Sequence, residues 1–72
     1  MIYHIDGYLE HRKLITRAIK MAGFKPIIYR PDFKNKKLLS IFYMADDNLT
    51  QDDCTEKING IVEMLMQGVE MD

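Results

Sequence analysis

A short segment near the start of the chain, HIDGYLEH (residues 4–11), concentrates side chains that can do chemistry. It holds two histidines, two carboxylates and a tyrosine within eight residues. Imidazole and carboxylate groups are common metal ligands and proton carriers. The segment is therefore either a metal or acid–base site, or the junction where a strand turns into a helix.

The spacing of these groups argues against a metal site. In an extended strand His4 and Asp6 share one face, whereas His11 lies one helical turn into the next element. A hydrolytic zinc site needs three protein ligands in tight geometry, and this spacing matches no ligand motif. We therefore expect that no metal binds here.

A strand-to-helix junction explains most of the segment without chemistry. Asp6 is placed to cap the following helix, and Glu10 suits the positive end of that helix. Tyr8 and His11 fall on the apolar stripe of the helix, which places them at the edge of the core. Only His4 stays unassigned, facing either solvent or a partner.

The rest of the chain offers no pattern typical of an enzyme. Cys54, the single cysteine, begins an apolar helical stripe, and buried cysteines are usually inert. Asp52 and Asp53 beside it oppose formation of a thiolate. Ser40, the single serine, lies inside an expected strand, and no glycine-rich phosphate loop is present. We expect no catalysis, no cofactor and no small-molecule substrate.

Hydrophobic periodicity predicts the elements that position these residues. A period of two predicts strands and a period near 3.6 predicts helices. The expected elements are a strand at 2–6, a helix at 8–22, strands at 25–30 and 38–44 joined around DFKNKK, and a helix at 51–67. A right-handed crossover then gives a single α+β domain over residues 1–72, with both helices on one sheet face. This β-α-β-β-α order is a ferredoxin-like arrangement lacking the last strand.

Local signals support these boundaries. Gly23 sits where a left-handed helix cap is wanted, and Thr50 with Asp53 three residues later is a helix-start signature. Gly60 lies inside the second helix and is expected to mark close packing. Pro31 cannot donate to a ladder, so the second strand is expected at an edge or a bulge.

A missing fourth strand would leave one edge of the sheet open. Residues 69–72 are too few to supply that strand. An open edge pairs readily with another chain. A domain this small also buries little surface on folding, so a second copy or a partner would stabilise it.

The overall composition limits the class of protein. The apolar content of 47% argues against disorder. The single cysteine fits a reducing compartment, and no apolar run is long enough for a membrane span or a signal peptide. We expect a soluble, cytoplasmic protein.

The net charge of −1 hides a division of charge along the chain. Residues 1–37 hold nine Lys/Arg and three Asp/Glu, or +6, whereas residues 38–72 hold one Lys and eight Asp/Glu, or −7. Such a chain can bind an anionic partner, a cationic partner or itself. Alternatively, the two halves interleave in the fold and the resulting field is mild.

Most of the basic residues fall in two groups, one on the outer face of the first helix and one in the DFKNKK loop. Together with an aromatic side chain, they form the expected partner-binding set: Arg12, Lys13, Arg17, Lys20, Phe33, Lys34, Lys36 and Lys37. This set fits three interpretations, namely an acidic protein surface, RNA or single-stranded nucleic acid, and a solvated face without a ligand. The pI near 6 weighs against nucleic acid.

The second helix carries more apolar surface than one core face needs. Its expected dimer or partner contacts are Ile61, Met64, Leu65 and Met66. Methionine suits adaptable binding surfaces, but it also fills gaps in a core.

Two function hypotheses follow. The first is a small non-enzymatic interaction module, homodimeric, that docks on a partner protein as a regulator or inhibitor. Analogy with compact, cofactor-free chains includes viral and mobile-element inhibitors in this class. The second is binding of RNA or single-stranded nucleic acid through the first helix and the DFKNKK loop.

Overall fold

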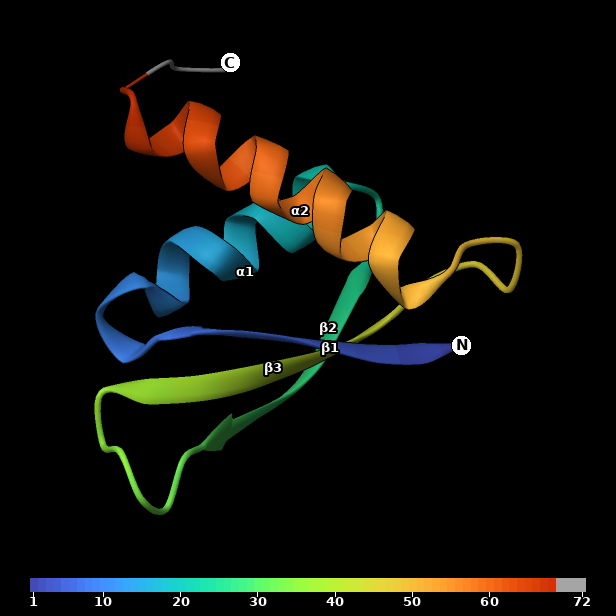
Figure 1. Cartoon of the computed structure of the whole chain (residues 1–72). Coiled ribbons are helices and arrows are strands. Elements are labelled where there is room, and N and C mark those ends of the chain that lie inside the picture. The colour runs from blue at the N-terminus through green and yellow to red at the C-terminus, as the bar shows by residue number, and fades with distance from the viewer. Residues whose placement is uncertain (69–72) are drawn as a thin grey trace.

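Three strands and two helices follow one another in the expected order (Figure 1). The computed structural model describes residues 1–68. Its elements are β1 (Ile2–Tyr8), a 3-10 turn η1 (Leu9–His11), α1 (Arg12–Met21), β2 (Lys25–Pro31), β3 (Leu38–Met44) and α2 (Gln51–Met66). The strands form one antiparallel sheet in the order β1-β3-β2, with both helices packed against it. The expected ferredoxin-like arrangement without its last strand is confirmed.

The strand register gives the sheet two different faces. The residue pairs Ile5↔Ile41 and Tyr3↔Tyr43 point toward the helices, whereas the alternate pair His4↔Phe42 points away from them. We call the second side the open face. It consists of Ile2, His4, Asp6, Tyr8, Leu38, Ser40, Phe42, Met44, Lys25, Ile28 and Arg30.

The core lies between the helix-facing side of the sheet and the two helices. Ile41 and Tyr43 are fully buried on the central strand, and Ile19 of α1 packs against them from the helix layer. The Tyr43 ring stacks on Phe24 at a centroid distance of 5.5 Å. From α2 the core receives only Cys54 and Ile58 as fully buried residues within residues 1–68.

The junction between β1 and α1 differs from its prediction. The strand continues to Tyr8, because Gly7 and Tyr8 pair with Leu39 and Leu38 of β3. The helix therefore begins at Arg12 after the 3-10 turn rather than at residue 8. Gly7 lets the helix approach closely, because a Cβ atom there would collide with the Ile15 side chain.

Both helices have the predicted end signals. Thr50 accepts a hydrogen bond from the Asp53 N–H at 3.1 Å, and Asp53 accepts one from the Thr50 N–H at 3.3 Å. Gly23 ends α1 with φ +89°, while the Phe24 N–H donates to the Ile19 carbonyl. These caps fix where each helix starts or ends against the sheet.

The sequence predicted that Gly60 marks close packing, and this prediction is wrong. Gly60 is exposed, and nothing lies within 4 Å of a Cβ atom built on it. We expect Gly60→Ala to stabilise the protein by about 0.5–1 kcal/mol, because alanine loses less backbone entropy in a helix. The measurement is the midpoint of urea unfolding.

Gly23→Ala provides the contrast for that prediction. The space around Gly23 is also empty, but its positive φ disfavours any side chain. We expect this variant to lose about 1 kcal/mol. Equal effects of the two substitutions would contradict the conformational explanation.

Both β1 and β2 lie at edges of the sheet, and β3 is central. The expected edge position of Pro31 is confirmed, and a register irregularity lies between Pro26 and Ile28. Within residues 1–68 no strand pairs on the outer side of β1. The prediction that residues 69–72 are too few to form a fourth strand concerns residues outside the described part of the chain. No helix in the described part is long and apolar enough to cross a membrane.

Candidate functional site

The carboxylate of Asp6 does not cap the helix, which corrects the prediction. Because the strand continues past it, Asp6 lies on the open face and accepts a hydrogen bond from the Ser40 hydroxyl. Neither N-terminal position of the η1–α1 segment, Tyr8 or His11, makes a side-chain capping bond. Tyr8 is 56% exposed rather than at the core edge, and its ring meets His11 edge-on.

His4, the residue left unassigned, is part of the open face. Its ring lies 5.4 Å from that of Phe42, measured between centroids. Its Nε2 atom is 4.0 Å from the carboxylate of Asp6. The imidazole and the carboxylate of the strand thus lie side by side on a surface that no helix within residues 1–68 covers.

The groups that could coordinate a metal or act as a nucleophile are dispersed or buried. Within residues 1–68 no three His, Cys, Asp or Glu side chains gather at a common point. Cys54 is buried, and burial raises the pKa of its thiol, which disfavours the reactive thiolate. Burial also raises the pKa of Tyr43 to about 12. Neither group is poised for chemistry near neutral pH.

The basic residues of α1 form one row. Arg12, Lys13, Arg17 and Lys20 line a shallow hollow together with Thr16 and Tyr29. The Arg12 guanidinium lies 5.8 Å from the centre of the Tyr29 ring, a cation–π distance. The Tyr29 and Thr16 hydroxyls are 3.0 Å apart, which fixes the ring beside the helix. The sequence had not indicated Tyr29 as part of this surface.

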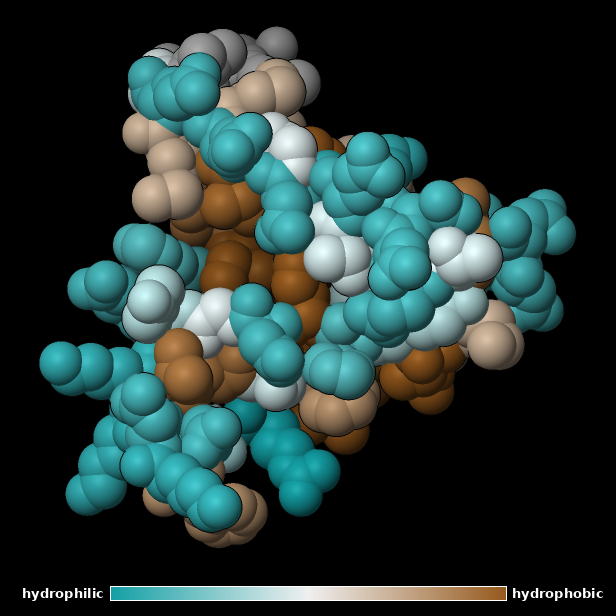
Figure 2. Space-filling view, in the orientation of Figure 1, coloured by the Kyte–Doolittle hydropathy of each residue, from teal (hydrophilic) through white to brown (hydrophobic). Residues whose placement is uncertain are grey.

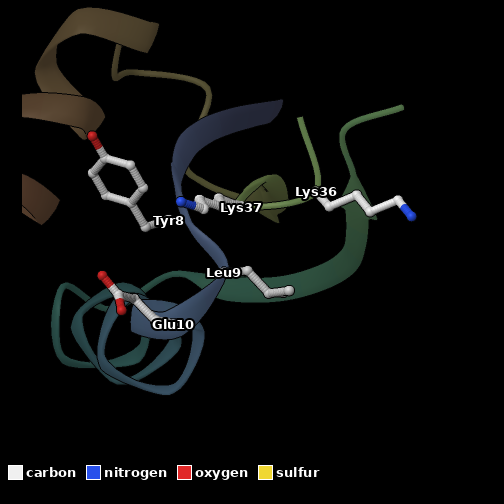
Figure 3. A pocket seen from close by; sticks show the side chains of 5 residues that line it. All are labelled: Tyr8, Leu9, Glu10, Lys36 and Lys37. Atoms are coloured by element: carbon white, nitrogen blue, oxygen red, sulfur yellow. The ribbon is translucent and has the colours of Figure 1, made fainter. Parts of the chain in front are cut away.

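The loop lysines Lys36 and Lys37 lie next to the start of α1. The Leu9 N–H donates to the Lys37 carbonyl oxygen at 2.7 Å, and both lysines line a hollow of about 540 Å³ with Tyr8, Leu9 and Glu10. Lys37 extends toward Tyr8, whereas Lys36 points away (Figure 3). A neighbouring hollow shares Leu9 and Glu10 and continues to Arg12 and Lys13. These cations therefore continue the row on α1, with Glu10 between them.

Phe33 and Lys34 turn to a different side. Asp32 holds the loop by accepting from the Lys34 N–H at 2.7 Å and from the Asn35 N–H at 3.1 Å. Phe33, 92% exposed, lines a hollow that reaches the open face. The lining of this hollow is His4, Arg30, Pro31, Asp32, Phe33, Lys34, Ser40 and Phe42. The predicted basic set is thus divided between two surfaces.

In the described residues, the opposite charges of the two halves of the chain do not pair with each other. Within residues 1–68 no Lys or Arg side chain lies within 4.0 Å of a carboxylate; the ion pairs found involve only the N-terminus and the two histidines. The outer side of α2 is acidic, with Asp52, Glu56 and Glu63 lining one hollow. The helices therefore expose surfaces of opposite sign.

The predicted contact residues on α2 also divide. Ile61 and Leu65 are half-buried and pack against the core, whereas Met64 and Met66 are exposed. Figure 2 shows hydrophobic surface in the hollow between α2 and the elements beneath it, framed by polar side chains. Part of the apolar arc of α2 thus completes the core, and part remains free.

The open face is a candidate interaction surface that sequence reasoning missed. Ile2, Ile28 and Met44 are 59%, 56% and 49% exposed there, and Phe42 lies half-buried between them. Lys25 and Arg30 flank this apolar centre on β2. Exposed apolar side chains in contiguous rows are typical of interaction surfaces. The available signal was the order of the strands, which places these residues side by side.

No protein-family model, curated protein sequence or solved structure matches the chain.

Proposed function

We propose that the protein is a non-enzymatic interaction module that docks on a partner protein through its open face and acts there as a regulator or inhibitor. One observation carries the proposal. The open face exposes Ile2, Ile28 and Met44 around Phe42, and no element within residues 1–68 covers them. Burying such side chains at an interface stabilises a complex by about 25 cal/mol per Å² before the costs of association.

Charge indicates which partner chemistry fits this face. Lys25 and Arg30 lie on its β2 side and Lys34 lines the hollow at its rim, whereas Asp6 lies on its β1 side and Asp32 also lines the hollow. A complementary surface is therefore apolar at its centre and acidic where it meets β2. The buried, inert Cys54 is compatible with the reducing cytoplasm as the place of action.

The test compares two variants that add the same charge at equally exposed apolar positions. Ile28 on the open face and Met66 on α2 are 56% and 58% exposed. Wild type, Ile28→Glu and Met66→Glu are used as baits in extracts of the native host, and the retained protein is then purified. Equilibrium binding of that purified partner is the deciding measurement. Circular dichroism confirms that each bait is folded.

We expect Ile28→Glu to raise the Kd for the partner at least about tenfold, the equivalent of 1.4 kcal/mol, and Met66→Glu to leave it nearly unchanged. Ile28→Thr, which keeps a β-branched residue in the strand, should weaken binding to a smaller extent. Equal binding by wild type and Ile28→Glu would exclude the open face as the docking surface.

A second candidate function has its own supporting observation. The hollow at the rim of the open face combines the aromatic rings of Phe33, Phe42 and His4 with the cations Arg30 and Lys34. Aromatic stacking together with phosphate neutralisation binds single-stranded nucleic acid. This proposal shifts the interface from the first helix to the open face.

A gel-shift titration with single-stranded RNA and DNA tests the second candidate. Binding should weaken with rising salt and with Lys34→Ala, whereas Lys36→Ala, on the other side of the loop, should have little effect. An absence of binding at low salt would exclude it. Equal losses in the two lysine variants would indicate general charge attraction instead.

A further inference from the structure

The outer edge of β1 directs a row of main-chain groups away from the sheet. The main-chain groups of the odd-numbered residues in and beside β1 bond toward β3. The Ala45 N–H donates to the Met1 carbonyl oxygen, and the Leu9 N–H donates to the Lys37 carbonyl oxygen. In an antiparallel pair neighbouring residues alternate in direction. The main-chain groups of the even-numbered residues therefore point outward: Ile2, His4, Asp6 and Tyr8.

One outward position is already occupied by a side chain that imitates a strand. The Gln51 amide nitrogen donates to the His4 carbonyl oxygen at 2.6 Å, and its amide oxygen accepts from the His4 N–H at 3.3 Å. These are the two bonds that a neighbouring strand would make. The main chains of Ile2 and Asp6 have no hydrogen bond outside the sheet within residues 1–68, whereas the Tyr8 carbonyl begins the 3-10 turn η1. The edge thus has the geometry for strand pairing.

We propose that β1 pairs antiparallel with β1 of a second copy of the chain, in a register centred on Ile5, so that the two sheets become one sheet of six strands. Gln51 releases His4, and the main chain of the partner's Asp6 takes over both bonds. His4 then faces the partner's Asp6, and Ile2 faces the partner's Tyr8. Each of these contacts occurs twice because the pairing is symmetric.

The sequence of β1 selects this register over its neighbours. Only the even-numbered residues of β1 have main-chain groups that point outward, so an even-numbered residue can pair only with an even-numbered residue of the second copy. A shift in one direction would place Asp6 opposite the partner's Asp6, which repels. A shift in the other would place His4 opposite the partner's His4 and Ile2 opposite the partner's Asp6. Only the register centred on Ile5 matches imidazole with carboxylate and an apolar side chain with an aromatic ring.

On the helix-facing side of the edge, this register places Tyr3 opposite the partner's Gly7. The space over Gly7 is filled by Ile15 of the same copy, so the Tyr3 ring would meet an apolar side chain there. Helix α2 packs mainly on α1 rather than over β1. Its half-buried Ile61 and Leu65 provide apolar surface on the same side of the sheet. The dyad brings both copies of α2 to one face of the joined sheet.

This inference rests on the proposed function in one respect, because it takes the open face as the docking surface. The homodimer would present two copies of that face together. Joining two sheets at β1 makes the two open faces continuous across the dyad. The apolar row of Ile2 and Met44 in one copy then continues into Tyr8 and Leu38 of the second copy. The partner protein would then meet a surface twice as wide as the open face of one copy.

A charge exchange tests the pairing by sedimentation equilibrium. His4→Asp places two carboxylates opposite each other across the dyad, so we expect the dimer Kd to rise about tenfold or more. Asp6→His places two imidazoles opposite each other and should also weaken the dimer. The double variant His4→Asp/Asp6→His restores opposite groups and should return the Kd to within about threefold of wild type. Thermal unfolding shows that each variant is folded.

A cross-link then reads the register directly. Chains carrying Ile2→Cys and chains carrying Tyr8→Cys are mixed under mild oxidation. We expect a disulfide between the two variants, because the Cα atoms of opposed residues lie about 5.5 Å apart. We expect none in either variant alone, because position 2 lies opposite position 8 and neither lies opposite itself. The native Cys54 is buried and does not compete.

A wild-type chain that stays monomeric at every concentration would overturn the inference, as would a double variant that dimerises no better than the single variants. Binding of the purified partner by such a monomer would leave the proposed function standing. Loss of partner binding by Ile28→Glu with an intact dimer would support that function independently, since Ile28 lies on β2, at the opposite edge of the sheet.

Discussion

Replacing Ile58 by alanine is expected to lower the free energy of unfolding by about 2–5 kcal/mol. Ile58 is completely buried, and with Cys54 it is one of only two fully buried residues that α2 contributes within residues 1–68. Removing three carbon atoms leaves a cavity between α2 and the core that the remaining side chains fill only partly. A domain this small has little stability to spare, so most of the cooperative transition should shift to low urea concentration.

Ile61→Ala is the matched control for this prediction. Ile61 lies on the same helix and loses the same atoms, but it is only half-buried. We expect it to cost about 1 kcal/mol. Urea unfolding followed by circular dichroism compares the two. Equal costs would show that α2 is not anchored chiefly through Ile58.

The second large effect is a loss of stability at alkaline pH. Burial, and secondarily the nearby Cys54 thiol, raises the pKa of Tyr43 from 10 to about 12. The folded protein therefore holds the phenolic proton more tightly than the unfolded chain does. The stabilisation is complete below pH 10 and is lost as the pH rises through 12. A shift of two units corresponds to a loss on the order of 3 kcal/mol when complete.

Tyr43→Phe isolates this contribution. The Tyr43 hydroxyl is buried without a hydrogen-bond partner in residues 1–68, so its removal should leave stability at pH 7 nearly unchanged or slightly raised. Between pH 9 and 11.5 the variant should lose less stability than wild type. Burial also raises the pKa of the Cys54 thiol, so the variant keeps a residual dependence of stability on alkaline pH. Identical pH profiles for the two proteins would contradict the assignment to Tyr43.

Local chemistry made the elements predictable. Strand β3 was predicted with its observed ends. The start of α2 was also predicted correctly, because the Thr50–Asp53 cap fixes where the helix begins, whereas its end was placed one residue too late. The start of α1 was placed four residues too early. Tyr8 and His11 fit a helical stripe by spacing alone, but pairing of Gly7 and Tyr8 with β3 keeps that segment extended. Tertiary pairing of this kind leaves no mark on local periodicity.

The open face escaped prediction for a related reason. Strand β3, LLSIFYM, is apolar on both sides, so an alternating pattern does not separate the buried Ile41 and Tyr43 from the open-face Phe42 and Met44. On β2 the irregularity between Pro26 and Ile28 shifts which residues face outward. The predicted basic residues were exposed as expected, but only the fold shows that Lys34 stands apart from Lys36 and Lys37.

Within residues 1–68 the opposite charges of the two helices form no ion pair, so this part of the molecule has a dipole moment that its net charge of −1 does not reveal. The basic row on α1 and the acidic outer side of α2 lie on adjacent helices, so the field changes sign across one side of the molecule. A charged surface approaching from solution would rotate the protein before contact, and association would be faster than its net charge implies. Because the screening length is about 8 Å at physiological ionic strength, this rotation acts only over the last part of the approach and fades with added salt.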